Sequence, residues 1–115
     1  MPDLNEEITH YQYEFRSVLD ENVEMLFLFA DNEEPMAMIM FSDKDKPLPG
    51  PKEAPSGVVV LTYRRRALRG IVDMLRNEKP IYFTWAAEHR IARITTEMEP
   101  PGEEEFRSIW SQLFG

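Results

Sequence analysis

Residues 23–41, VEMLFLFADNEEPMAMIMF, contain two apolar runs that are separated by one acidic turn. Val23 to Ala30 and Met36 to Phe41 are apolar at both odd and even positions, which is typical of central strands covered on both faces. Asp31 to Pro35 supplies the polar residues expected of a loop. The stretch therefore predicts two neighbouring strands at the centre of a sheet.

The segment before this stretch has two competing interpretations. From Thr9 to Ser17, aromatic residues alternate with polar ones, which predicts a strand with one buried face. The apolar residues between Ile8 and Leu19 would also share one face of a helix across residues 6–20, which Asn5 could cap. The aromatic content favours the strand, so we expect a three-stranded meander with the two apolar runs.

The second half of the chain predicts further strands and two helices. Residues 42–57 hold four prolines and three lysines and predict an extended loop. A fourth strand is expected at Val58 to Leu61, and a helix that Thr62 caps and Pro80 stops. Two more strands, at residues 81–86 and 91–98, are joined by a hairpin at residues 87–90, and a last helix includes Phe106, Ile109, Trp110 and Leu113. Whether strands four and five pair in parallel, or the helix between them leaves the sheet, stays open.

These elements predict one domain over residues 1–115 of the α+β class, with an antiparallel-rich sheet and the order β-β-β-β-α-β-β-α. The chain has 43% hydrophobic and 30% charged residues, which are ordinary values for a folded protein. It has no cysteine, so disulfides and thiolate metal ligands are excluded. The acidic start is unlike a signal peptide, and the apolar runs are too short to span a bilayer. We expect a cytoplasmic protein that does not bind membranes.

Charge is distributed unevenly along the chain, whose net charge is −8. Residues 1–34 contain ten acidic residues and one arginine, whereas residues 57–93 contain eight basic residues and three acidic ones. A basic middle with interspersed aromatic residues is typical of single-strand binders, because cations follow the phosphates while bases stack on rings. The candidate nucleic-acid-binding residues are Arg64, Arg65, Arg66, Trp85, Arg90 and Arg93. The alternative is that these arginines pair with the acidic ends and that Tyr63, Tyr82 and Trp85 belong to the core.

Candidates for catalysis or metal binding are few. His10 lies in an expected strand and His89 in an expected hairpin turn, without a serine elbow or zinc-type spacing near them. The acidic loop at residues 31–34 lacks the ligand spacing of a calcium loop. We therefore expect no catalytic residue, no metal and no cofactor, and predict that the protein is not an enzyme.

Met36, Met38 and Met40 share one face of one expected strand. Methionine packs adaptably, so this face could form a dimer or partner surface. Packing in the core is the other interpretation, and the sequence favours it.

The order of elements resembles that of the single-stranded-DNA-binding transcriptional regulators of the Whirly and positive-cofactor type. Residues 80–105, which include PIYFTW and ITTEMEPPGEEE, resemble small uncharacterised cyanobacterial proteins that are grouped with this fold. The resemblance implies a homodimer with an exposed sheet face that holds an unstacked strand. The lysine-glycine-lysine contact motif of the Whirly proteins is not found in this chain.

Two function classes follow from this reading of the sequence. The first is a homodimeric, non-enzymatic protein that binds single-stranded nucleic acid. The alternative is a protein-interaction module similar to the acidic dimeric secretion chaperones, whose clients bind as extended chains.

Overall fold

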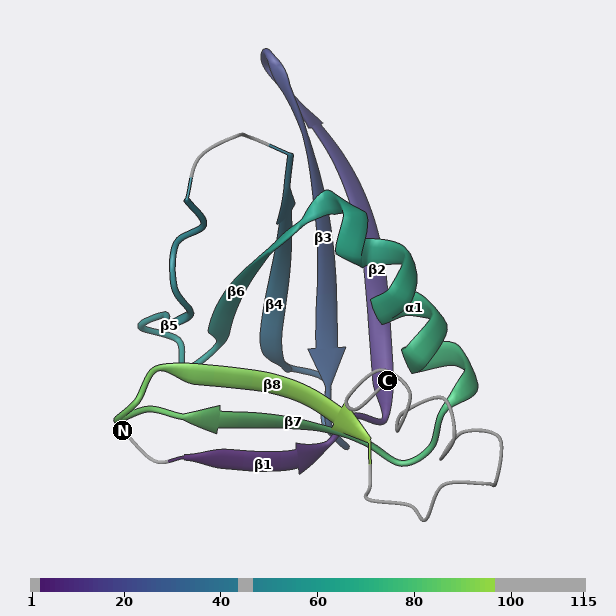
Figure 1. Ribbon diagram of the computed structural model, residues 1–115, viewed down its shortest axis with the longest axis vertical. Coiled ribbons are helices and arrows are strands. Elements are labelled where there is room, and N and C mark those ends of the chain that lie inside the picture. The colour runs from purple at the N-terminus through teal and green to yellow at the C-terminus, as the bar shows by residue number, and fades with distance from the viewer. Residues whose placement is uncertain (1–2, 44–46, 97–115) are drawn as a thin grey trace, which may run out of the picture.

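The computed structural model describes residues 3–43 and 47–96, which form two sheets and one α-helix (Figure 1). Strands account for 55% of the described residues and helices for 14%. The predicted α+β class and the Whirly-like arrangement are therefore wrong, and the fold is mostly β. The predicted C-terminal helix, which includes Phe106 and Leu113, lies outside the described residues.

The larger sheet contains the two apolar runs at its centre. It consists of β2 (His10–Val18), β3 (Glu21–Phe29), β4 (Pro35–Ser42), β5 (Lys52–Glu53) and β6 (Val59–Arg64), in the order β2-β3-β4-β6-β5. Strands β2, β3 and β4 pair antiparallel, which confirms the predicted meander and the strand interpretation of its first segment. Strand β6 pairs in parallel with β4, because the chain between them passes through the far edge strand β5 before it returns.

The smaller sheet combines the two ends of the described chain. Its strands are β1 (Leu4–Glu7), β7 (Ile81–Ala86) and β8 (Ile91–Thr96), in the antiparallel order β1-β7-β8. The β7–β8 hairpin was predicted and is confirmed, whereas β1 was not predicted. Since β6 and β7 lie in different sheets, the helix between them leaves the first sheet, which is the second of the two alternatives.

Ile8 and Thr9 connect the two sheets at a sharp corner. The backbone N–H of Ile8 donates to the carbonyl oxygen of Ile81 in the smaller sheet at 2.7 Å. The next N–H, of Thr9, donates to Phe29 in the larger sheet at 2.9 Å. The two residues that link β1 to β2 are thus hydrogen-bonded to one sheet each.

The helix α1 (Leu68–Asn77) follows a short 3-10 helix, η1 (Arg65–Ala67). Thr62 was predicted to cap this helix, but it lies inside β6, and neither helix has a side-chain cap. The strand continues through Arg64 because its residues still pair with β4 up to Ser42. Within the described residues, no helix has the length and apolar character needed to cross a bilayer.

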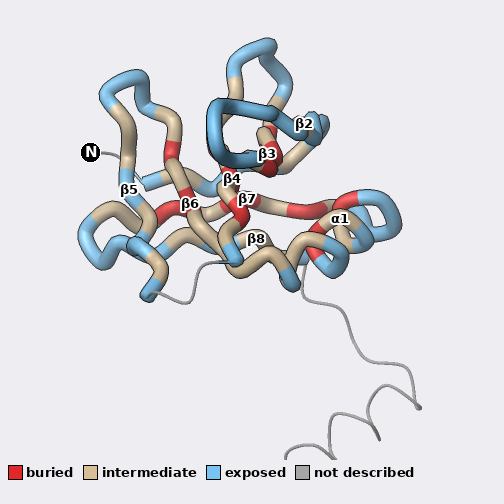
Figure 2. The backbone as a smooth tube through the Cα atoms, turned by 90° about the horizontal axis from the view of Figure 1, so that it is seen from above, coloured by how far each residue is buried: buried red, intermediate tan, exposed pale blue. Residues whose placement is uncertain are grey.

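The core lies where the larger sheet, the smaller sheet and α1 meet. Alternate residues of the central strands point into it, including Leu26, Ile39 and Leu61, while β7 supplies Phe83 and α1 supplies Leu75. Buried positions accordingly gather along β3, β4, β6, β7 and the inner side of α1, whereas the β2 strand is exposed (Figure 2). Packing of apolar side chains between the two sheets therefore holds the two layers together.

Two isoleucines of the smaller sheet test this placement of the core. Ile81 is buried in the core, whereas Ile91 is about half exposed on the other face of the sheet. Ile81→Ala should lower the free energy of unfolding by about 2–5 kcal/mol, and Ile91→Ala by less than about 1 kcal/mol. Urea denaturation followed by circular dichroism measures both values. Equal losses for the two variants would contradict the described packing.

Candidate interaction surface

Strand β2 forms one edge of the larger sheet, with β3 as its neighbour among the described strands. It is nine residues long, and all of them except Glu14 are exposed. An edge strand presents unpaired backbone N–H and C=O groups, and proteins usually shorten, charge or cover such edges. Here the edge is long and carries aromatic residues, which is the property expected of a binding surface.

Tyr11, Tyr13 and Phe15 form a row along one face of β2. Phe15 is 66% exposed and Tyr13 is 38% exposed. Their rings meet edge to face, with centroids 5.1 Å apart and an interplanar angle of 84°. The sequence predicted this face to be buried, and that prediction is wrong, because the smaller sheet and α1 cover the neighbouring strands and leave β2 outside.

A groove of about 550 Å³ separates the aromatic row from α1. Tyr11 and Tyr13 form one wall, and Leu68 and Val72 of the helix form the apolar part of the other. Three charged residues of α1 line the remainder: Arg69, Asp73 and Arg76. The groove therefore offers apolar contact area with charged groups at its rim.

A buried carboxylate anchors the aromatic row to the sheet. Glu24 of β3 is 5% exposed, and its Oε2 accepts a hydrogen bond from the Tyr13 hydroxyl at 3.1 Å. Its Oε1 lies 2.6 Å from Nε of Arg65, an ion pair without the alignment of a hydrogen bond. Arg65 in turn donates from Nη1 to Oδ2 of Asp43 at 2.9 Å. This chain of contacts joins β2, β3, η1 and the loop after β4.

The same contacts change the acidity of Tyr13. Partial burial of the ring, and then the hydrogen bond to the Glu24 carboxylate, raise the pKa of the Tyr13 hydroxyl above its ordinary value. The hydroxyl therefore stays protonated and able to donate at neutral pH. Sequence reasoning missed Glu24, although a carboxylate inside an apolar run is a signal, because such a group must find a partner when the run is buried.

The predicted nucleic-acid-binding arginines do not form one surface. Arg64, Arg65 and Arg66 lie at the end of β6 and in η1, whereas Arg90 lies in the turn between β7 and β8 and Arg93 lies in β8 of the smaller sheet (Figure 1). Arg65 is engaged by Glu24 and Asp43. These contacts match the alternative interpretation for Arg65, in which the arginine pairs with acidic residues of the N-terminal half.

Trp85, the predicted stacking residue, is 3% exposed and belongs to the core. It lies on the inner face of β7, opposite Leu4 of β1 and Ala92 of β8. Its ring is therefore covered, and a nucleotide base has no access to it. The aromatic residue of the same strand on the outer face is Tyr82, which was assigned to the core as an alternative and is half-buried.

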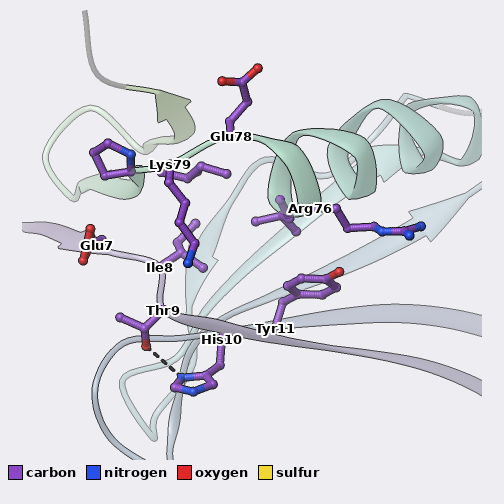
Figure 3. A pocket seen from close by; sticks show the side chains of 11 residues that line it. Glu7, Ile8, Thr9, His10, Tyr11, Arg76, Glu78 and Lys79 are labelled. Atoms are coloured by element: carbon purple, nitrogen blue, oxygen red, sulfur yellow. Dashed lines mark hydrogen bonds between the residues drawn. The ribbon is translucent and has the colours of Figure 1, made fainter.

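A second hollow, of about 430 Å³, lies between the end of α1 and the start of β2 (Figure 3). His10 is one of the residues that line it, and its Nδ1 is 2.9 Å from Oγ1 of Thr9. The Thr9 hydroxyl also lies 2.7 Å from the carbonyl oxygen of Ala30, and when it donates there, Nδ1 of His10 is the donor to Thr9. This arrangement is the reverse of a histidine that activates a hydroxyl nucleophile.

The other candidates from the sequence lie on the surface. His89 is exposed in the hairpin turn, and Asp31 and Glu34 are exposed in the loop before β4. Among the described residues, no group of three histidine, aspartate or glutamate side chains is placed to hold a metal ion.

The methionines of β4 are half-buried. Met38 and Met40 alternate with Ile39 and Phe41, so they lie on the sheet face that points away from the smaller sheet. Of these three methionines, Met36, at the start of the strand, is the one that packs against the core cluster.

A comparison of the chain with protein-family models, curated proteins and solved structures found no match. The candidate surface is therefore defined by geometry alone: the β2 edge, its aromatic row and the adjoining groove.

The ion pair beneath this surface can be tested with two neighbouring arginines. Arg65→Ala leaves the buried Glu24 carboxylate without its cation, so the free energy of unfolding should fall by about 2 kcal/mol, between the values of surface and buried pairs. Arg66→Ala, at an exposed position, should change it by less than about 0.5 kcal/mol. Urea denaturation at neutral pH compares the two variants. If both variants lose less than about 0.5 kcal/mol of unfolding free energy, the contacts of Arg65 with Glu24 do not stabilise the protein as described.

Proposed function

We propose that this protein is a protein-interaction module whose edge strand β2 receives an extended segment of polypeptide. The observation that carries the proposal is the nine-residue edge with three exposed aromatic residues on one face. Strand addition at such an edge gains affinity from backbone hydrogen bonds, while pockets for alternate side chains give specificity. Here the edge of β2 provides the backbone groups, and the groove provides the contacts for side chains.

The side chains around β2 define what kind of segment fits. On the aromatic face, the groove beside Tyr11 and Tyr13 accommodates apolar side chains at every second position of the added strand. On the opposite face, Glu14 accepts a hydrogen bond from Nε of Arg16 at 2.8 Å, so the charges of β2 are balanced. For a free peptide, basic flanks add a long-range attraction to the net charge of −8.

A model peptide tests strand addition directly. A fluorescent peptide of alternating valine and threonine, with a lysine at each end, should show a rise in anisotropy as the protein is added. Phe15→Ala removes the most exposed ring of the aromatic row and should weaken binding about tenfold, which corresponds to about 1.4 kcal/mol.

Ile91→Ala is the matched control, since Ile91 is also an exposed apolar residue of a strand but lies in the smaller sheet. It should leave the peptide affinity unchanged. Equal affinity for the wild-type protein and the Phe15→Ala variant would count against β2 as the binding edge.

A second candidate function, the binding of single-stranded nucleic acid, is favoured by the outer face of the smaller sheet. Arg93 is exposed there opposite Thr84, and Tyr82 lies opposite Thr95 on the same face. Arg90 is exposed in the adjoining turn. A tyrosine with two nearby arginines is the minimum set for base stacking and phosphate contact.

A titration with a labelled thymidine oligonucleotide of about 20 nucleotides tests this candidate. The double variant Arg90→Ala/Arg93→Ala should bind more weakly, and the slope of log affinity against log salt should fall by about 1.4, about 0.7 for each lost phosphate contact. The control Arg69→Ala/Arg76→Ala removes two exposed arginines of α1 and should keep the slope of the wild-type protein. If the wild-type protein does not bind the oligonucleotide at low salt, the binding of single-stranded nucleic acid is excluded as a function.

A further inference from the structure

We infer that the strand received by β2 is the β2 strand of a second copy of this chain, in an antiparallel register centred on Phe15. This inference rests on the proposed function and names the partner for the same edge. It would join two five-stranded sheets into one continuous sheet across a two-fold axis.

Symmetry limits the possible registers. A two-fold axis that relates two antiparallel edge strands stands perpendicular to the sheet, so residues that face each other lie on the same face of it. The aromatic row of one copy therefore continues into the aromatic row of the other. The remaining choice is which residue lies on the axis.

The charges of β2 select that residue. A register centred on Phe15 places Glu14 of each copy opposite Arg16 of the other, so the Glu14–Arg16 pairs of the two copies would join in one network of alternating charges. A register centred on Glu14 would bring two carboxylates together, and one centred on Arg16 would bring two guanidinium groups together. A register centred on Tyr13 would place His10 opposite Arg16 and leave Glu14 opposite Gln12.

The exposed aromatic ring also favours this register. Phe15 is the most exposed member of the aromatic row, and on the axis it would lie directly opposite Phe15 of the second copy. Aromatic pairs that face each other across neighbouring strands stabilise a sheet. Both rings would lose their contact with water in the process.

The tip of the β2–β3 hairpin approaches the groove in the same register. Leu19 is 91% exposed in the turn that follows β2, and pairing centred on Phe15 brings this turn toward the Tyr11 end of β2 in the second copy. Tyr11 forms the wall of the groove that Leu68 and Val72 line from the helix side. An exposed apolar side chain of one copy thus comes near the apolar wall of the groove in the other.

The local charge permits this approach although each copy carries a net charge of −8. Strand β2 contains one acidic residue, Glu14, and one arginine, Arg16, so the paired edges are neutral apart from the histidine. Repulsion between the remaining acidic groups is long-range and is screened by salt.

Charge reversals on β2 test the register by sedimentation equilibrium. Glu14→Arg and Arg16→Glu should each raise the dimer dissociation constant at least about tenfold, because both symmetric ion pairs become like-charge pairs. The double variant Glu14→Arg/Arg16→Glu restores opposite charges and should recover dimers. An equimolar mixture of the two single variants should also recover them, as heterodimers.

Two control variants carry the same changes of charge outside β2. Glu33→Arg lies in the loop before β4 and Arg93→Glu lies in β8, and both positions are exposed. They should dimerise like the wild-type protein, and circular dichroism should show that all variants fold. Single reversals on β2 that act no more strongly than these controls overturn the inference, as does a double variant that stays monomeric.

The peptide assay separates failure of this inference from failure of the proposed function. A wild-type protein that stays monomeric at about 200 µM, a concentration well above that of ordinary micromolar complexes, overturns self-pairing. If the same protein binds the alternating peptide, the edge receives strands but not its own copy, and the proposed function stands. If it does not bind the peptide either, both the self-pairing inference and the proposed function are overturned.

Discussion

The inner face of the larger sheet is apolar over three strands, and the rest of the structure follows from the need to cover it. Leu26, Ile39 and Leu61 lie side by side on β3, β4 and β6, so water must be excluded from a wide, continuous surface. The smaller sheet covers it with Ile81, Phe83 and Trp85, and α1 covers the remainder with the buried side chains of Ile71 and Leu75. The chain can supply this cover because the segment after β6 leaves the first sheet and returns across its face.

The cover is narrower than the sheet, and the candidate interaction surface is the part that it leaves open. Strand β2 pairs fully with β3 but lies beyond the reach of the smaller sheet, so its aromatic residues stay in contact with water. Glu24 lies at the border between the covered and uncovered regions, and the contacts with Tyr13 and Arg65 satisfy its carboxylate there. The exposed edge is thus held in place by polar contacts, while the interior is held by apolar packing.

Several strands could be predicted from the sequence because their signal is local. The apolar runs at β3 and β4, the alternation at β2 and the hairpin of β7 and β8 are all visible within short windows. Strand β1 was missed because Leu4–Glu7 is mostly polar and is extended only through pairing with β7, far along the chain. Burial was equally hidden: Phe15 and Trp85 are both aromatic residues of alternating strands, and only the position of the second sheet makes one exposed and the other buried. The pairing of Arg65 with Glu24 depends on the same three-dimensional arrangement.

The pairing of β1 with β7 also sets an order of events during synthesis on the ribosome. Leu4 is translated before the larger sheet, yet its partner Trp85 is made only after the whole larger sheet and α1 have been translated. The strands β2, β3 and β4 pair with neighbours along the chain, so this meander can form while β1 is still unpaired. Until β7 is complete, the nascent chain displays an uncovered apolar sheet face, which is the state that chaperones recognise in growing polypeptides. Once the smaller sheet has closed, it covers the apolar face, and the growing chain is no longer exposed to aggregation through it.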